Sequence, residues 1–152
     1  MIRLSRLADY GVVLMTHIAG DAERPCAAHA VAAATRIPEP TVSKVLKALS
    51  RHGLLESHRG VNGGYTLARA PSEISVTEII AAVDGPIAMT ECLDADGGAC
   101  SLETFCPTRG SWLKINNAIR QALDEISLAD MIAPTLLFPP PAAPGERRRL
   151  IS

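Results

Sequence analysis

Three of the four cysteines stand close together in the second half of the chain and could serve as metal ligands. Cys92, Cys100 and Cys106 are separated by seven and five residues, in a stretch rich in glycine and acidic residues. Three thiolates on one flexible loop can converge on one metal centre, and soft thiolates suit an iron–sulfur cluster or zinc. The spacing lacks the pairs of cysteines with only two residues between them that are usual in structural zinc sites. The plainer interpretation is that these are incidental loop thiols.

The sequence around these cysteines would support a charged metal centre. A long helix is expected from Pro107, and the free N–H groups and positive dipole end of a helix start stabilise thiolates. The fourth cysteine, Cys26, lies far from the others and is expected to be a small structural residue. Four cysteines in a chain of this size, without a secretion signal, indicate ligands or reactive thiols rather than a disulfide framework.

A second group of residues has the chemistry of a DNA contact. A helix expected at 41–52 carries hydroxyls and cations on its outer face: Thr41, Ser43, Lys44, Lys47 and Arg51. Such a helix fits the major groove, where hydroxyls approach base edges and cations neutralise phosphates. Arg59 and Gly60 would lie at a hairpin tip, where arginine can enter a narrow minor groove and glycine allows close approach. The alternative is a basic face that is only solvated.

The elements that must position these residues follow from apolar periodicity and turn signals. Ser5 can cap the first helix, and the run from Ser75 to Glu78 is a capping box. Helices are expected at 5–19, 27–35, 41–52, 75–83 and 107–126, and short strands at 54–58 and 64–68. Two apolar faces should pack inward. They are Leu7, Tyr10, Leu14, His17 and Ile18 in the first helix, and Val42, Val45, Leu46 and Leu49 in the third.

This order of elements predicts the fold class. Helix, turn, helix and a glycine-rich hairpin with an Asn62–Gly63 turn signal indicate a mainly α protein with a small β-hairpin wing. We expect a winged helix-turn-helix DNA-binding domain at 1–85, a cysteine-bearing cluster-binding loop at 86–106, a dimerisation helix at 107–133 and a disordered, proline-rich tail at 134–152.

The last long helix also bears on the oligomeric state. It carries a long apolar stripe of Trp112, Ile115, Ile119, Leu123 and Ile126, which favours a homodimer. Two-fold symmetry is what the reading of a palindromic operator requires. The alternative is that the stripe packs only on the first helix of its own chain.

Charge and composition set the broad class. The chain has 152 residues, 47% of them hydrophobic, which is enough for one compact domain. The net charge of −1 alone argues against nucleic acid, but it is +4 over 1–70, −7 over 71–133 and +2 over 134–152. A basic front half joined to an acidic back half predicts two separate tasks. With no run of about 18 apolar residues and no signal-peptide core, a cytoplasmic protein without a membrane span is expected.

Several motifs together give the sequence a specific resemblance. They are RLSRLADYG at 3–11, PTVSKVLKAL at 40–49, SHRGVNGGY at 57–65 and the three-cysteine loop. With these, residues 1–133 resemble the Rrf family of bacterial winged helix-turn-helix transcriptional regulators, in its IscR- and NsrR-like group. SVTEIIAAV at 75–83 and GPIAMTEC at 85–92 look closest to the branch that regulates the SUF system of iron–sulfur cluster assembly.

The resemblance implies a dimeric repressor or activator that binds double-stranded operator DNA. An iron–sulfur cluster, of the 2Fe–2S or 4Fe–4S type, would be held by Cys92, Cys100 and Cys106. Some relatives add a histidine three residues after the last cysteine, where this chain has Arg109. Others use an aspartate of the first helix, supplied by the partner subunit, and Asp9 stands at the matching place, although it could be an ordinary first-turn acid. The DNA-contacting roles carry over to Thr41, Ser43, Lys44 and Arg59.

Two functions follow from these observations. The first is a cluster-sensing regulator, in which cluster binding orders the cysteine loop and sets the spacing between two reading helices. The alternative is a related DNA-binding regulator that senses nitric oxide, iron or redox state through a zinc or thiol switch. A thiol-dependent enzyme is disfavoured, because no histidine lies in the cysteine loop and no strand–turn–helix nucleophile motif is present.

Overall fold

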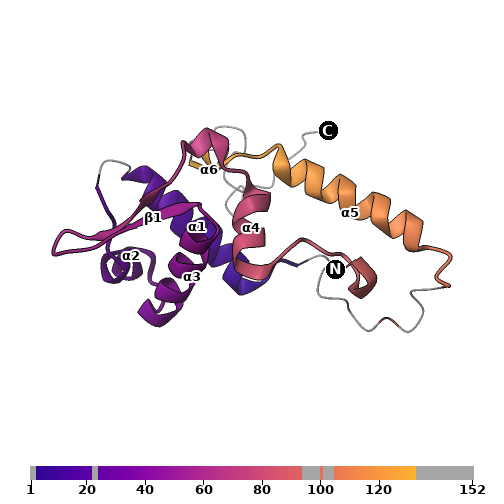
Figure 1. The fold of residues 1–152 in the computed structure, drawn as a ribbon, viewed down its shortest axis with the longest axis horizontal. Helices are drawn as coiled ribbons and strands as arrows, with labels where there is room; N and C mark the ends of the chain where they lie inside the picture. The colour runs from indigo at the N-terminus through magenta and orange to yellow at the C-terminus, as the bar shows by residue number, and fades with distance from the viewer. Residues whose placement is uncertain (1–2, 22–23, 94–99, 101–104, 133–152) are drawn as a thin grey trace, which may run out of the picture.

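The computed structural model describes residues 3–21, 24–93, 100 and 105–132 (Figure 1). The helices are α1 (Arg6–Gly20), α2 (Ala28–Thr35), α3 (Glu39–Arg51), α4 (Val76–Asp84), α5 (Arg109–Asp124) and α6 (Leu128–Ile132). The strands are β1 (Leu55–His58) and β2 (Gly64–Leu67), and two short 3-10 turns are η1 (Pro71–Glu73) and η2 (Glu91–Leu93). The tail predicted at 134–152 and most of the cysteine loop lie outside the described residues.

The arrangement confirms a mainly helical, winged helix-turn-helix fold. Helices α1 to α4 pack around one core, and the β1–β2 hairpin projects from it (Figure 1). Helix α5 points away from this core on the opposite side to the hairpin, and α6 folds back over α1. No helix of the described residues is both long and apolar enough to cross a membrane.

Helix α3 is held by its apolar face. Its predicted inner residues are all buried: Val42, Val45, Leu46 and Leu49. The helix begins at Glu39, two residues before the predicted start, because Pro40 tolerates the first helical turn, where no N–H is needed. It ends before Gly53, whose φ of 74° is a conformation that glycine adopts without strain.

Helix α1 follows its predicted bounds, with one error in its inner face. The Ser5 hydroxyl accepts a hydrogen bond from the Ala8 N–H at 3.0 Å and caps the helix. Leu14 and Ile18 are buried, as expected. The prediction that His17 faces the core is wrong: this side chain is exposed in the last turn, where a cation would be favoured by the helix dipole.

The hairpin is antiparallel, with Ser57 paired to Tyr65 and His58 to Gly64. Its tip is a five-residue loop, 59–63, closed by a hydrogen bond from the Gly63 N–H to the Gly60 carbonyl at 3.0 Å, rather than a two-residue Asn–Gly turn. Cys26 extends the sheet by one bridge, because it exchanges two 2.9 Å backbone hydrogen bonds with Tyr65. Gly64 is required beside it, since a Cβ there would lie 2.6 Å from the Cys26 carbonyl oxygen.

The C-terminal end of α5 is fixed to the helical core. After Asp124 the chain turns, and backbone bonds run from the Val76 N–H to the Ile126 carbonyl at 2.9 Å and from the Leu128 N–H to the Ile74 carbonyl at 2.8 Å. Leu128 is then fully buried in the main core. The segment predicted as one dimerisation helix therefore contains two helices, and the second of them completes the core of the DNA-reading part.

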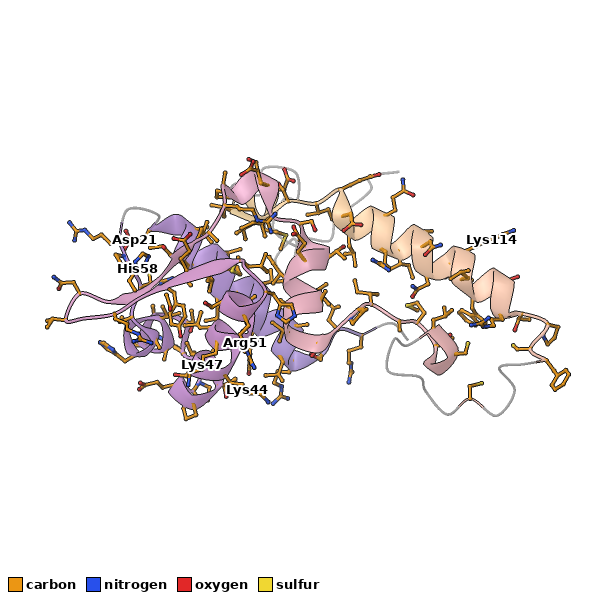
Figure 2. The ribbon with its side chains drawn as sticks, viewed as in Figure 1. Asp21, Lys44, Lys47, Arg51, His58 and Lys114 are labelled. Carbon is orange, nitrogen blue, oxygen red and sulfur yellow. The ribbon has the colours of Figure 1, made fainter. Side chains whose placement is uncertain are left out.

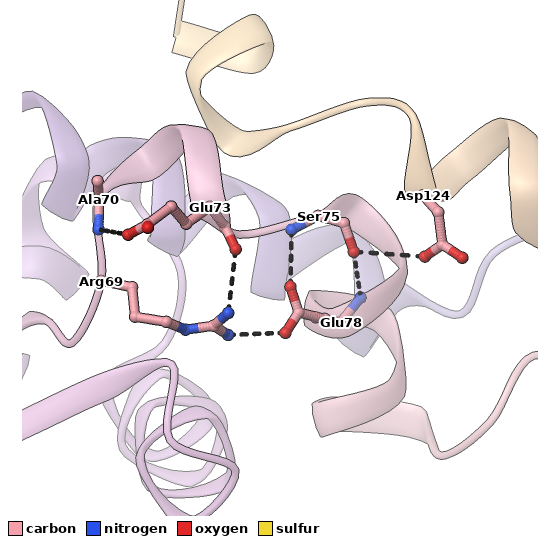
Figure 3. A network of polar contacts seen from close by, with 6 residues as sticks. All are labelled: Arg69, Ala70, Glu73, Ser75, Glu78 and Asp124. Atoms are coloured by element: carbon pink, nitrogen blue, oxygen red, sulfur yellow. Dashed lines mark hydrogen bonds and ion pairs between the residues drawn. The ribbon is translucent and has the colours of Figure 1, made fainter.

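A polar network reinforces this attachment (Figure 3). The Arg69 guanidinium donates to the Glu78 carboxylate at 2.7 Å and to the Glu73 carbonyl at 3.0 Å, while the Ser75 hydroxyl bonds to Asp124 at 3.4 Å. Partial burial raises the pKa of Glu78, but the bonds from Ser75 and Arg69 outweigh it and hold this pKa below its ordinary value. The stabilisation is complete above the ordinary pKa and is lost as pH falls through the lowered one.

We predict that Leu128→Ala destabilises the whole helical core. Removing a fully buried leucine costs about 2–5 kcal/mol, through lost burial and the cavity left behind. Urea denaturation at fixed protein concentration measures the change. The matched control is Met131→Ala on the same helix, where the side chain is 46% exposed and the expected cost is below about 1 kcal/mol. Equal costs for the two variants would show that α6 is not part of this core.

Candidate nucleic-acid interface and thiol site

The outer face of α3 concentrates positive charge. Lys44, Lys47 and Arg51 are all exposed and lie along one side of the helix at three- and four-residue spacing (Figure 2). Their side chains leave the core in the same general direction, and the Arg51 Nε donates to the Lys47 carbonyl at 3.4 Å. Glu39 is the only acid of the helix. This face can therefore neutralise a line of phosphates.

The two hydroxyl residues predicted to contact DNA lie nearer the core than these cations. Thr41 and Ser43 are half-buried in the first turns of α3. Short side chains in this position let the helix backbone approach a base edge closely, while the longer lysines reach outward. All five predicted residues of α3 therefore lie outside its buried apolar face.

The hairpin presents the second predicted contact. Arg59 and Gly60 are exposed at its tip, and the Gly60 φ of 112° favours glycine. Below the tip, His58 is braced across the strands, with its Nε2 2.8 Å from the Thr66 hydroxyl. The tip therefore carries a cation on a short, closed loop that stands clear of the core.

A groove between α3 and the hairpin joins these two surfaces. It has a volume of about 470 Å³ and is lined by Lys47, Ser50, Arg51, Ser57 and Tyr65. Ser57 and Tyr65 lie directly opposite each other on the two strands, on the face that continues from buried Leu55. Sequence reasoning missed Ser50, Ser57 and Tyr65. The alternation of side chains along the strand indicates that Ser57 shares a face with Leu55. Which residues of α3 that face meets depends on tertiary packing, which the sequence does not show.

The cysteines divide into two environments. Cys26 is buried, and burial, with a smaller contribution from Asp21, raises the pKa of its thiol. Cys92, Cys100 and Cys106 are half-exposed free thiols. Two of these have a hydroxyl within hydrogen-bond distance: Thr90 lies 3.2 Å from the Cys92 sulfur and Thr108 lies 3.4 Å from the Cys106 sulfur. The bond with the Thr108 side chain, followed by its backbone, lowers the pKa of the Cys106 thiol.

The donor set and the geometry give different answers about a metal. Three accessible thiols with hydroxyl neighbours have the chemistry of a soft-metal site. In the described part of the chain, however, no three side chains of histidine, cysteine, aspartate or glutamate gather closely enough to hold an ion. Asp9 is exposed in the first turn of α1, beside Ser5 and Arg6, and so does not complete such a group. The residues between the cysteines at 94–99 and 101–104 lie outside the described part.

Comparison with known proteins decides the family. A family model described as Rrf2, an iron-dependent transcriptional regulator, matches residues 4–134. The chain belongs to the Rrf2 family. It is a DNA-binding transcriptional regulator, and the relatives of this Rrf2 protein are regulators rather than enzymes.

This Rrf2 chain is similar in sequence and structure to several individual regulators. It is 31% identical over 132 residues to the regulator NsrR of Geobacillus kaustophilus, which covers 86% of this chain and 90% of NsrR. Among solved structures, IscR of T. potens matches with a TM-score of 0.67 and 31% identity, covering 86% of each chain. CymR, the global cysteine regulator of B. subtilis, matches with a TM-score of 0.68 and 28% identity, covering 87% of this chain and 97% of CymR. These two structures confirm the winged helix-turn-helix fold class.

The two thiol environments of the Rrf2 protein generate a prediction. In the reduced native protein at pH 8, iodoacetamide should alkylate Cys106 at least about tenfold faster than Cys26, because exposure and a lowered pKa favour the reactive thiolate. Peptide mass spectrometry follows both rates. Unfolding in urea should bring the two rates together, which serves as the control. A native Cys26 rate that equals that of Cys106 would contradict the described packing of the Cys26 bridge.

Proposed function

We propose that this protein is a homodimeric regulator that senses an iron–sulfur cluster and controls the SUF genes of iron–sulfur cluster assembly. The observation that carries the proposal is the separation of a basic α3–hairpin face from the η2 turn and the start of α5, which lie at the other end of the molecule next to the half-exposed thiols of Cys92 and Cys106 (Figure 1). The iron-dependent description of the family and the similarity to IscR and NsrR support it. A regulator of this kind would act in the cytoplasm, where its DNA lies.

In the DNA-bound state, α3 would lie in the major groove and the hairpin in the adjacent minor groove. Thr41, Ser43 and Lys44 would face bases and the nearest phosphates, while Lys47 and Arg51 would neutralise the phosphates farther along. Arg59 would enter the minor groove, with Gly60 allowing its backbone to approach. The groove between α3 and the hairpin would then accept the sugar–phosphate strand that separates the two grooves of the duplex.

A second copy of the chain would cover the apolar side of α5. Trp112, Leu113 and Ile115 are 38–49% exposed, which is unusual for three large apolar residues within one turn of a helix. If two such helices crossed, these side chains would be buried, and the two α3–hairpin faces would lie on the same side of the dimer. Light scattering across a size-exclusion peak should then give the mass of two chains.

At the thiol end, Cys92, Cys100 and Cys106 would hold the cluster, which supplies a redox- and iron-sensitive centre when bound. The position that some relatives fill with a histidine is Arg109 here, so the remaining ligand must come from elsewhere. We propose Asp9 of the partner subunit for this role. The chain's own contribution would be to present Cys92 on the η2 turn and Cys106 three residues before the start of α5.

A second candidate function is a zinc or bare-thiol switch. It is favoured by the similarity to CymR, the global cysteine regulator of B. subtilis, and by the absence of a metal-binding cluster among the described residues. Metal analysis separates the two functions: iron with acid-labile sulfide indicates a cluster, whereas zinc without sulfide indicates the alternative.

We predict that Lys47→Ala weakens binding to duplex DNA selected from random sequences by the protein itself. Loss of one phosphate contact should weaken binding several-fold and reduce the slope of log affinity against log salt by about one. Fluorescence anisotropy at several salt concentrations measures both. Lys114→Ala is the matched control, because Lys114 is also exposed but lies on α5, far from the α3 face (Figure 2). If both variants lose the same affinity, the α3 face is not the interface.

The cysteine ligands generate a separate prediction. Anaerobically purified protein should show a visible iron–sulfur chromophore, and Cys92→Ala, Cys100→Ala or Cys106→Ala should each abolish it or greatly reduce it. Cys26→Ala is the matched control and should keep the chromophore, because this thiol is buried beside the hairpin. Retention of the full chromophore in all three loop variants would refute the ligand assignment.

A further inference from the structure

Helix α5 buries one residue, and that residue is polar. Asn116 is 5% exposed, whereas Ile119 and Leu123 on the same face are only half-buried. A buried amide is costly unless its hydrogen bonds are made, so its position is defined more strictly than that of an apolar neighbour. The helix is therefore located on the rest of the protein by a specific polar contact at its middle.

The partner of Asn116 leads to a predicted thiol ligand. The Asn116 Oδ1 accepts a hydrogen bond from the Met89 N–H at 3.0 Å, between residues 27 positions apart in the chain. Three residues beyond Met89 is Cys92, which lies in the η2 turn. That turn is closed by the Leu93 N–H bonding to the Thr90 carbonyl at 3.0 Å, and the Thr90 hydroxyl lies 3.2 Å from the Cys92 sulfur. A short chain of contacts thus joins the amide to the thiol.

A cavity lies beside this contact. It has a volume of about 340 Å³ and lies between α5, the segment that follows α4 and the chain before α1, and its lining includes Leu4, Ile87, Met89, Ile119 and Leu123. Apolar contacts around a cavity tolerate small displacements of one element along the other. A hydrogen bond to the buried Asn116 side chain does not, because a displacement leaves the amide oxygen without its donor. The Asn116–Met89 bond is therefore what sets the register of this segment on α5.

We infer that Asn116 is a positioning residue that holds Cys92 in register with α5 and transmits movement of the thiol segment to that helix. The positioning role stands on the contacts alone, and only its regulatory consequence rests on the proposed function. When Cys92 is drawn toward the other thiols by a shared metal, the segment at Met89 must move or pull α5 with it. While the Asn116–Met89 bond is intact, the segment is expected to pull α5 with it.

Two variants of the full-length protein test the positioning role in its reduced, metal-free form. Asn116→Ala removes the acceptor, and Ile119→Ala removes only apolar packing from the same helix face. Iodoacetamide alkylation of Cys92 and hydrogen exchange at the Met89 amide are the readouts, with alkylation of Cys106 as the internal control.

We expect Asn116→Ala to speed both Cys92 alkylation and Met89 exchange by about tenfold, because the segment opens locally. Cys106 alkylation should stay within about twofold, and the Cys92 and Met89 rates of Ile119→Ala should stay close to those of the wild-type protein. Unchanged Cys92 and Met89 rates in Asn116→Ala, or equal acceleration at Cys106, would overturn the inference. If Asn116→Ala does not fold, Asn116→Ser, which is too short to reach Met89, gives the same comparison.

A DNA-binding arm separates this inference from the proposed function. For the unmodified protein, the ratio of DNA affinities with and without the bound metal centre should differ from one, and Asn116→Ala should bring it toward one. A ratio of one in the unmodified protein would refute the sensing function, while the alkylation results would still decide the role of Asn116. A ratio that survives in Asn116→Ala would refute transmission through this bond.

Discussion

The structure depends on the way in which the end of α5 is joined to the DNA-reading core. Two backbone hydrogen bonds, between residues 74–76 and 126–128, align the chain after α5 with the chain before α4. Leu128 is then buried in the core, and the ion pair between Arg69 and Glu78 stabilises the start of α4. Without this junction, the C-terminal end of α5 would not be fixed to the core. With it, a force on α5 acts directly on the core that carries α3 and the hairpin.

This junction gives the uneven charge of the chain a physical meaning. The basic face lies on α3 and the hairpin, whereas the segment from 71 to 133 carries an excess of seven negative charges. Attraction to phosphates is therefore confined to the basic face. The described acids of this segment, such as Glu78, Asp84 and Asp130, lie on η1, α4 and the chain around α6 rather than on the α3–hairpin face. A net charge near zero conceals this division.

Much of the DNA-binding part, from α1 to α4, could be predicted from local sequence signals. Serine caps, the capping box at Ser75 and the apolar period of α3 each act within a few residues, so the sequence contains the whole cause. The errors and omissions have tertiary causes. His17 fits an apolar period but lies at the helix end, and Tyr65 meets α3 only through the hairpin register. Asn116 resembles an ordinary surface residue until Met89 is seen to bond to it. The gathering of the cysteines stays a prediction.

The central proposal is that a homodimer couples a metal centre held by thiols to DNA binding by its two α3–hairpin faces. The most direct test is an anaerobic titration of selected duplex DNA with the protein, before and after removal of its bound metal and sulfide, combined with the stoichiometry of the complex. The account predicts two chains per duplex and affinities that differ by about tenfold or more between the two forms. One chain per duplex, or the same affinity for both forms, would contradict it.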